Sequence, residues 1–120
     1  MLTKVSETIT TAADGSATVY LGSRLTGRVH AIQYTKGTLD AGTDLVITGE
    51  TTEVAILTDS PGASEWFYPR AFANKVTDGA AFTDVTEDVV VLQERIKVVV
   101  AQGGAGGVGT IAAIVDVETY

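Results

Sequence analysis

A glycine pattern in the last quarter of the sequence has the spacing of a phosphate-binding loop. Gly104, Gly106 and Gly109 spell G-x-G-x-x-G directly after a β-branched run that begins at Ile96. A dinucleotide site also needs a helix at the glycines, a returning strand and an acidic residue about 20 positions on. Only 11 residues follow the last glycine, and 111–117 alternate as a strand does. We therefore expect no cofactor here, and we interpret the glycines as the tip of a hairpin.

The sequence offers little for nucleophilic catalysis. His30 is the only histidine, cysteine is absent, and no G-x-S-x-G element that could carry an activated serine occurs. We expect His30 to have a structural or surface role within a strand, and we expect no catalytic residue.

Acidic residues could instead hold a hard cation. Asp40 with Asp44, and Asp78 with Asp84, each flank a glycine. Neither stretch follows the D-x-[DN]-x-[DN]-G order of a calcium loop with its distant glutamate. We interpret both as ordinary turns and predict no metal site.

The segment WFYPRAF, residues 66–72, concentrates four of the eight aromatic residues. Pro69 cannot donate to a sheet ladder, so we predict an edge strand or an extended excursion. In one interpretation its aromatic side chains cap the core. In the other, part of the group contacts another subunit, because Trp, Tyr and Arg dominate interface hot spots. Both can hold, since neighbouring residues of an extended segment point to opposite sides. The candidate interface residues are Trp66, Phe67, Tyr68, Arg70 and Phe72.

Length and charge set the wider limits. The 120 residues predict a single β domain spanning 1–120. Fifteen acidic residues against eight scattered basic ones give a net charge of −7, which argues against a nucleic-acid partner. No uninterrupted apolar run approaches the ~20 residues of a membrane span, and we expect no signal peptide.

Turn residues divide the chain into short segments that alternate apolar and polar positions, which predicts strands. We expect 74–87 to be mostly loop. Within 86–99 we predict two strands with a short turn or bulge between them, followed by a C-terminal hairpin. The fold class is therefore all-β, an antiparallel β-sandwich or small jelly-roll-like barrel of about eight short strands. The remaining predicted strands are 4–11, 17–21, 28–35, 45–48 and 54–58.

The run DGSATVYLGSRLTGRVHAIQYTKGTLDAGTDLVITGETTEVAILT (Asp14 to Thr58), followed by YPRA (Tyr68 to Ala71), resembles small virion structural proteins of tailed bacteriophages. Such proteins are compact β domains that decorate or cement the capsid, or serve as minor head proteins. The resemblance implies a non-enzymatic role, a virion location after synthesis in the host cytoplasm, and the major capsid protein as partner. It also implies a homo-oligomer, with a trimer favoured.

Two other classes of function stay open. A carbohydrate-binding or adhesion module would use exposed Trp66 and Tyr68 as stacking platforms. An enzyme would need His30 clustered with a serine or carboxylates in a deep pocket.

Overall fold

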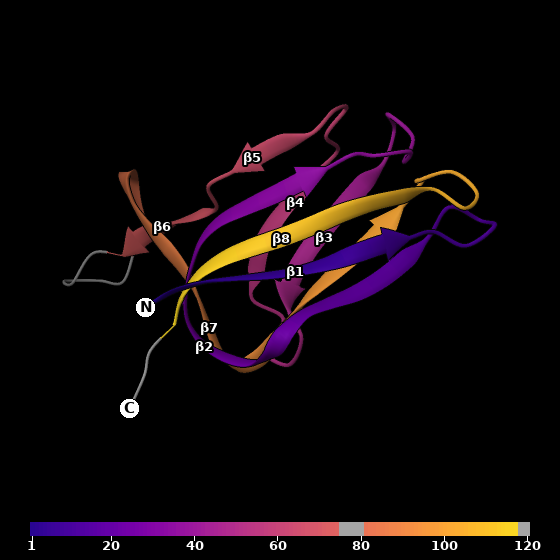
Figure 1. The fold of residues 1–120 in the computed structure, drawn as a ribbon. Helices are drawn as coiled ribbons and strands as arrows, with labels where there is room; N and C mark the ends of the chain where they lie inside the picture. The colour runs from indigo at the N-terminus through magenta and orange to yellow at the C-terminus, as the bar shows by residue number, and fades with distance from the viewer. Residues whose placement is uncertain (75–80, 118–120) are drawn as a thin grey trace.

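The structure is a computed structural model that describes residues 1–74 and 81–117, without the side chains of 72–74 and 81–85. The described residues form eight β-strands and no helix, which confirms the predicted all-β class (Figure 1). No helix able to cross a membrane is found among them. The strands are β1 (Leu2–Thr10), β2 (Ala17–Thr35), β3 (Asp44–Gly49), β4 (Ala55–Asp59), β5 (Glu65–Phe67), β6 (Arg70–Asn74), β7 (Ala81–Ala101) and β8 (Val108–Val117).

All pairings between these strands are antiparallel, in the order β1-β8-β2-β7-β3-β4. Two short strands leave this path, because β5 pairs with β2 and β6 pairs with β7. The sheet does not close into a barrel, so of the two predicted architectures the sandwich describes it better.

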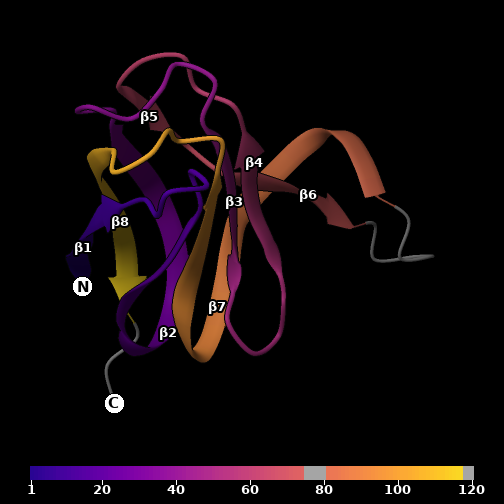
Figure 2. The ribbon, with the colours of Figure 1, turned by 90° about the vertical axis from the view of Figure 1, so that its right-hand side faces the viewer.

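Two long strands are bent, and their bends create the layers. The first part of β2, 17–21, pairs with 96–100 of β7, whereas 27–35 of β2 pairs with β8. Between these parts the β2–β7 register shifts on both sides of Leu25, and Gly22 and Gln93 have positive φ angles of 74° and 49°. Figure 2 shows β1 and β8 on one side and β3 and β4 on the other, with β2 and β7 between them.

The bends lie where the sequence predicts breaks between strands. One register shift lies between Leu25 and Gly27, next to the predicted start of a strand at position 28. A Cβ atom at Gly27 would lie 2.1 Å from the carbonyl oxygen of Asp116, so only glycine fits there. The segments predicted as separate strands on either side of each bend are instead one continuous β2 and one continuous β7.

The core lies between the layers and follows the period of two expected of strands. Alternate residues of β7 and β8 have no exposed surface, and they belong to one buried cluster together with residues of β2 and β3. Burying side chains of this size stabilises the fold by roughly 1.5–3 kcal/mol each. The fully buried residues of β7 and β8 include Ile96, Val98, Val100, Ile111, Ala113 and Val115.

The predicted C-terminal hairpin is wrong, because β7 and β8 do not pair with each other. Strand β2 lies between them, and β8 pairs with β1 on its other edge. The glycine-rich segment 102–107 is therefore a crossover, not a hairpin tip. It is fixed to the first turn of the chain, where the Gly103 N–H donates to the Gly15 carbonyl at 2.9 Å and Thr11 Oγ1 donates to the Gly104 carbonyl at 2.5 Å.

The prediction of a loop over 74–87 is also wrong for its second half. Strand β7 begins at Ala81, and its first part pairs with β6 through Arg70 with Asp88 and Asn74 with Ala81. Cross-strand pairing outweighs the polar composition of this stretch. Residues 75–80 lie outside the described residues. Figures 1 and 2 show the β6–β7 pair projecting from the two layers.

Candidate interaction surface

The aromatic segment forms one edge of the layer that contains β1, β8 and the second part of β2. Strand β5 adds to β2 with Trp66 opposite Gln33 and Phe67 opposite Ile32. Because successive side chains of a strand point to opposite faces, Phe67 follows fully buried Ile32 toward the core, and Trp66 faces outward. The pleat thus gives these two aromatic side chains different roles.

The exposure of the side chains agrees with this alternation. Trp66 is 47% exposed and Tyr68 is 60% exposed, whereas Phe67 packs against the buried cluster and Pro69 is buried. The expectation that neighbouring residues of this segment point to opposite sides is confirmed for Trp66 and Phe67. The side chain of Phe72 lies outside the described residues.

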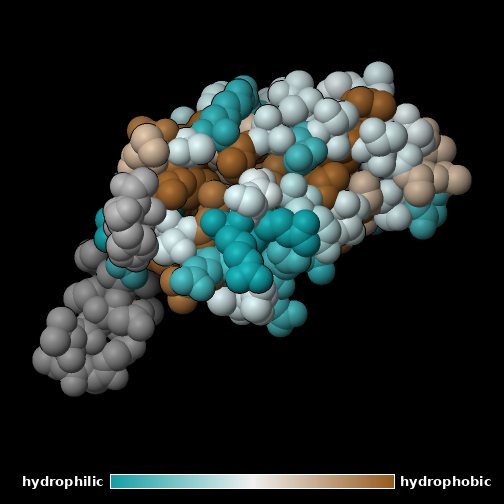
Figure 3. Space-filling view, turned by 60° about the horizontal axis from the view of Figure 1, so that its bottom comes forward, coloured by the Kyte–Doolittle hydropathy of each residue, from teal (hydrophilic) through white to brown (hydrophobic). Residues whose placement is uncertain are grey.

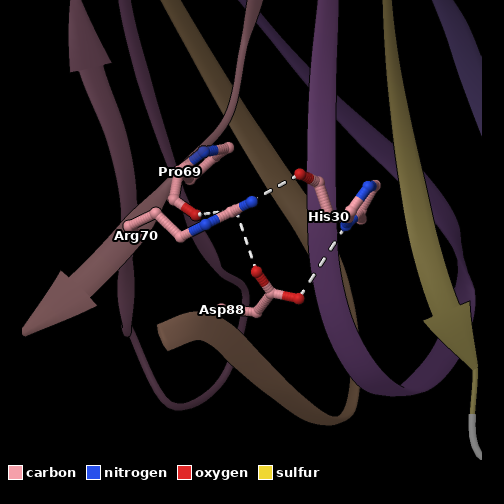
Figure 4. A network of polar contacts seen from close by, with 4 residues as sticks. All are labelled: His30, Pro69, Arg70 and Asp88. Atoms are coloured by element: carbon pink, nitrogen blue, oxygen red, sulfur yellow. Dashed lines mark hydrogen bonds and ion pairs between the residues drawn. The ribbon is translucent and has the colours of Figure 1, made fainter. Parts of the chain in front are cut away.

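Arg70 fixes the end of this segment through a cluster of polar contacts (Figure 4). Its Nη1 lies 2.9 Å from Oδ1 of Asp88 and also donates to the Pro69 carbonyl at 2.8 Å and the His30 carbonyl at 3.4 Å. Because Asp88 is on β7 and His30 is on β2, one guanidinium connects three strands. The cluster holds the base of the projecting β6–β7 pair against the two layers.

His30 takes part in the same cluster. Its Nδ1 lies 3.9 Å from Oδ2 of Asp88, and its side chain is half exposed. Arg70 lies closer to Asp88 than His30 does and is therefore the main partner of that carboxylate. This position fits the predicted structural or surface role.

A shallow cavity of about 130 Å³ borders the indole of Trp66. Its lining residues include Gln33, Ser64 and Glu65, and Gln33 is directly opposite Trp66 in the β2–β5 pairing, so one polar side chain lies on the same face as the exposed ring. Ser64 Oγ accepts a hydrogen bond from the Lys36 backbone N–H at 2.9 Å, which fixes the loop before β5.

A second polar region lies where β2 and β7 bend. The side of the molecule brought forward in Figure 3 carries a group of hydrophilic side chains with hydrophobic side chains exposed around it. A cavity of about 460 Å³ opens at this bend, and Glu94, only 2% exposed, forms part of its wall. The cavity is lined by Ser23, Arg24, Glu50, Thr51, Gln93, Glu94 and Arg95.

The carboxylate of Glu94 is used to hold the neighbouring turn. Oε1 accepts the N–H groups of Thr51 and Thr52, each at 3.0 Å, and Oε2 accepts the Leu92 N–H at 3.2 Å and the Thr52 hydroxyl at 2.8 Å. Burial alone would raise the pKa of Glu94, but the hydrogen bonds from Thr52, Leu92 and Thr51 outweigh it, so the pKa is lowered. With its oxygens occupied, this carboxylate has a structural role.

A half-buried ion pair lies beside Glu94. Arg95 donates Nε to Glu50 Oε2 at 2.7 Å and Nη2 to Oε1 at 2.5 Å, and its guanidinium lies 4.1 Å from the ring centre of Tyr20. The hydrogen bond from Arg95 lowers the pKa of Glu50, and the same bond raises the pKa of Arg95. This bidentate pair closes the turn between β3 and β4 over the bend.

Asp40 and Asp44 lie in a turn that is held by hydrogen bonds. The Asp40 carbonyl accepts Thr43 N–H at 3.2 Å and Thr43 Oγ1 at 2.6 Å, and Asp44 accepts the Ser60 hydroxyl at 2.5 Å. Asp78 and the side chain of Asp84 lie outside the described residues. Within the part of the chain that the structure describes, no group of three or more His, Cys, Asp or Glu side chains could hold a metal ion.

Sequence reasoning identified Trp66 and Arg70 but missed their partners. Asp88 is 18 positions from Arg70 in the sequence, and only the β6–β7 register places the two residues opposite each other. Gln33 likewise reaches Trp66 only through the β2–β5 pairing. No local pattern marks either partner.

The chain was also compared with known proteins. No protein-family model, no curated protein and no solved structure matches it.

Proposed function

We propose that this protein is a non-enzymatic virion structural protein that decorates or cements the capsid of a tailed bacteriophage. The observation that carries the proposal is the exposure of Trp66 and Tyr68 on a segment held in place by its neighbours. Phe67 packs against the buried cluster, Pro69 is buried, and Arg70 is paired with Asp88. Large aromatic side chains held in place lose little conformational entropy on binding, which makes them effective anchors.

The surroundings of the two rings support a protein contact. Arg70 supplies a planar cation at one end of the segment, although Asp88 partly neutralises it. Trp, Tyr and Arg together have the composition of an interface hot spot. The proposed partner is the major capsid protein, the proposed location is the virion, and self-association of the chain is part of the proposal.

Cosedimentation with assembled capsids tests the proposal. Replacing one hot-spot aromatic residue typically costs about 2 kcal/mol or more of binding free energy, about 30-fold in affinity. Trp66→Ala and Tyr68→Ala should therefore release the protein from capsids while changing its melting temperature little. Val46→Ala is the matched control, because Val46 is an exposed apolar residue (39%) on β3 in the opposite layer. Equal binding by the Trp66 variant and wild type would refute the proposed contact.

A carbohydrate-binding module is the second candidate. The observation that favours it is the cavity beside Trp66, whose lining also includes the polar residues Gln33, Ser64 and Glu65, with Gln33 directly opposite the exposed ring. Sugar recognition uses this combination of a stacking surface and hydrogen-bonding groups. This function would be selected over the first if the isolated protein binds a glycan array and does not bind capsids. Trp66→Ala and Gln33→Ala should then both lose the glycan binding.

A further inference from the structure

We propose that the bond between Asp14 and Gly15 is a site of spontaneous backbone isomerisation, and that Ser16 slows the reaction in the folded chain. The product is an isoaspartyl bond, in which the backbone runs through the side chain of Asp14. The proposal does not rest on the aromatic segment or on the proposed function. It follows from the chemistry of an Asp-Gly pair and from the hydrogen bonds that hold this turn.

The reaction needs only groups of the chain and water. The backbone nitrogen of Gly15 attacks the side-chain carboxyl carbon of Asp14 and closes a succinimide ring, while the carboxyl O–H group leaves with the amide proton as water. Water then opens the ring at either carbonyl, which gives aspartate or isoaspartate. Glycine favours the attack, because it has no side chain to obstruct its nitrogen and its backbone is conformationally free. Asp14 is one of two aspartates in the sequence that precede a glycine, and it is exposed to water.

In the structure both reacting groups are engaged in other bonds. Oδ1 of Asp14 accepts the Ser16 N–H at 3.0 Å and the Ser16 hydroxyl at 2.7 Å. The Gly15 N–H donates to the Ala12 carbonyl at 3.0 Å, and the Ala12 N–H donates to the Ser16 carbonyl at 2.9 Å. Ring closure removes the Gly15 proton, so it must break the bond to Ala12. The closed turn therefore opposes the reaction.

Ser16 also keeps Asp14 in its less reactive charge state. Ring closure expels a hydroxyl group, so it proceeds from the protonated carboxyl group rather than from the carboxylate. The Ser16 hydroxyl, followed by the Ser16 N–H, stabilises the carboxylate and lowers the pKa of Asp14. At neutral pH, each unit by which a carboxyl pKa falls reduces the protonated fraction about tenfold. Removing the hydroxyl should therefore speed the reaction.

An isoaspartyl bond here would disturb the contact between the first turn and the glycine-rich segment 102–107. It inserts the Cβ methylene of Asp14 into the backbone directly before Gly15. Gly15 is buried with a φ of 83°, its carbonyl accepts the Gly103 N–H at 2.9 Å, and a Cβ atom built on it would lie 3.1 Å from the Gly104 nitrogen. Because Gly15 packs this closely against the crossover, a longer backbone before it must displace it and break the bond to Gly103.

Incubation of the intact protein at pH 7, well below its melting temperature, tests the role of Ser16. Isoaspartate at position 14 is measured by peptide mapping, since a protease that cleaves before aspartate does not cleave before isoaspartate. Ser16→Ala should accumulate isoaspartate several-fold faster than wild type. Ser16→Thr keeps both the hydroxyl and the N–H, so this matched control should react as slowly as wild type. Both variants should stay folded by circular dichroism, because Ser16 is exposed. Equal rates for wild type and Ser16→Ala would overturn the proposal.

A second comparison needs no variant. Wild type unfolded in urea should form isoaspartate at position 14 faster than the folded protein, because unfolding removes the turn, and equal rates in the two states would contradict the protection. The isoaspartyl protein, separated by chromatography, should melt about 4 °C below the parent, the shift expected for the loss of one backbone hydrogen bond in a domain of this size. An unchanged melting temperature would refute the predicted loss of the Gly15–Gly103 contact.

Discussion

Glu94→Gln tests whether one buried carboxylate holds the bend between the two layers. The glutamine oxygen can still accept from Thr51 and Thr52, but its NH2 group replaces the oxygen that accepts the Leu92 N–H. One buried N–H loses its acceptor, at about 1–3 kcal/mol, and the remaining bonds lose their charge assistance, at about 1 kcal/mol. The expected loss in free energy of unfolding is about 2–4 kcal/mol, or about 8–16 °C in melting temperature for a domain of this size.

The pH dependence identifies the carboxylate as the cause. Hydrogen bonding lowers the pKa of Glu94 in the folded state below its unfolded value of about 4.3. Its contribution to stability is therefore complete above about pH 5 and is lost as the pH falls through the folded pKa. The difference in stability between wild type and Glu94→Gln should narrow in acid. Other carboxyl groups with lowered pKa, such as Glu50 and Asp116, act equally in both proteins.

Urea unfolding of both proteins at pH 7 and at pH 3 measures the effect. Glu53→Gln is the matched control, because Glu53 lies in the same turn with an exposed side chain, and its stability should stay within about 0.5 kcal/mol of wild type. A Glu94→Gln variant as stable as wild type would refute the structural role. A stability difference that is the same at both pH values would show that side-chain packing, rather than the carboxylate charge, causes the loss.

Two further predictions concern the core and the crossover. Val98→Asp should abolish folding, as measured by circular dichroism, because Val98 is fully buried; a folded variant would contradict the assignment of the core. Gly106→Ala should lower the free energy of unfolding by about 1 kcal/mol at most. A Cβ atom at Gly106 has open space, and only the φ of 65° opposes the substitution. Tyr34→Phe should raise the melting temperature by a few degrees, because the Tyr34 hydroxyl is buried and its polar neighbour, the Thr43 hydroxyl, donates to the Asp40 carbonyl instead. A marked loss of stability would show that Thr43 and Tyr34 form a stabilising hydrogen bond.

The sequence predicts the strands of this fold better than their arrangement. Alternation identified 111–117 as a strand correctly, since Ile111, Ala113 and Val115 share one parity and are all buried. It could not show that β2 lies between β7 and β8, because strand order depends on contacts between distant residues. The glycines marked a change of direction in both the predicted hairpin and the observed crossover, and a local pattern cannot separate the two.

For the candidate surface too, the sequence predicted the segment itself but not the residues that surround it. The aromatic composition of 66–72 and the position of Pro69 marked an edge segment, and the structure assigns outward and inward sides to Trp66 and Phe67. The polar partners of this segment come from β2 and β7, so their proximity depends on register. Glu94 is the clearest case of a hidden role. Between Gln93 and Arg95 it resembles a solvent-exposed turn residue, yet the bend in β7 buries it under the turn between β3 and β4.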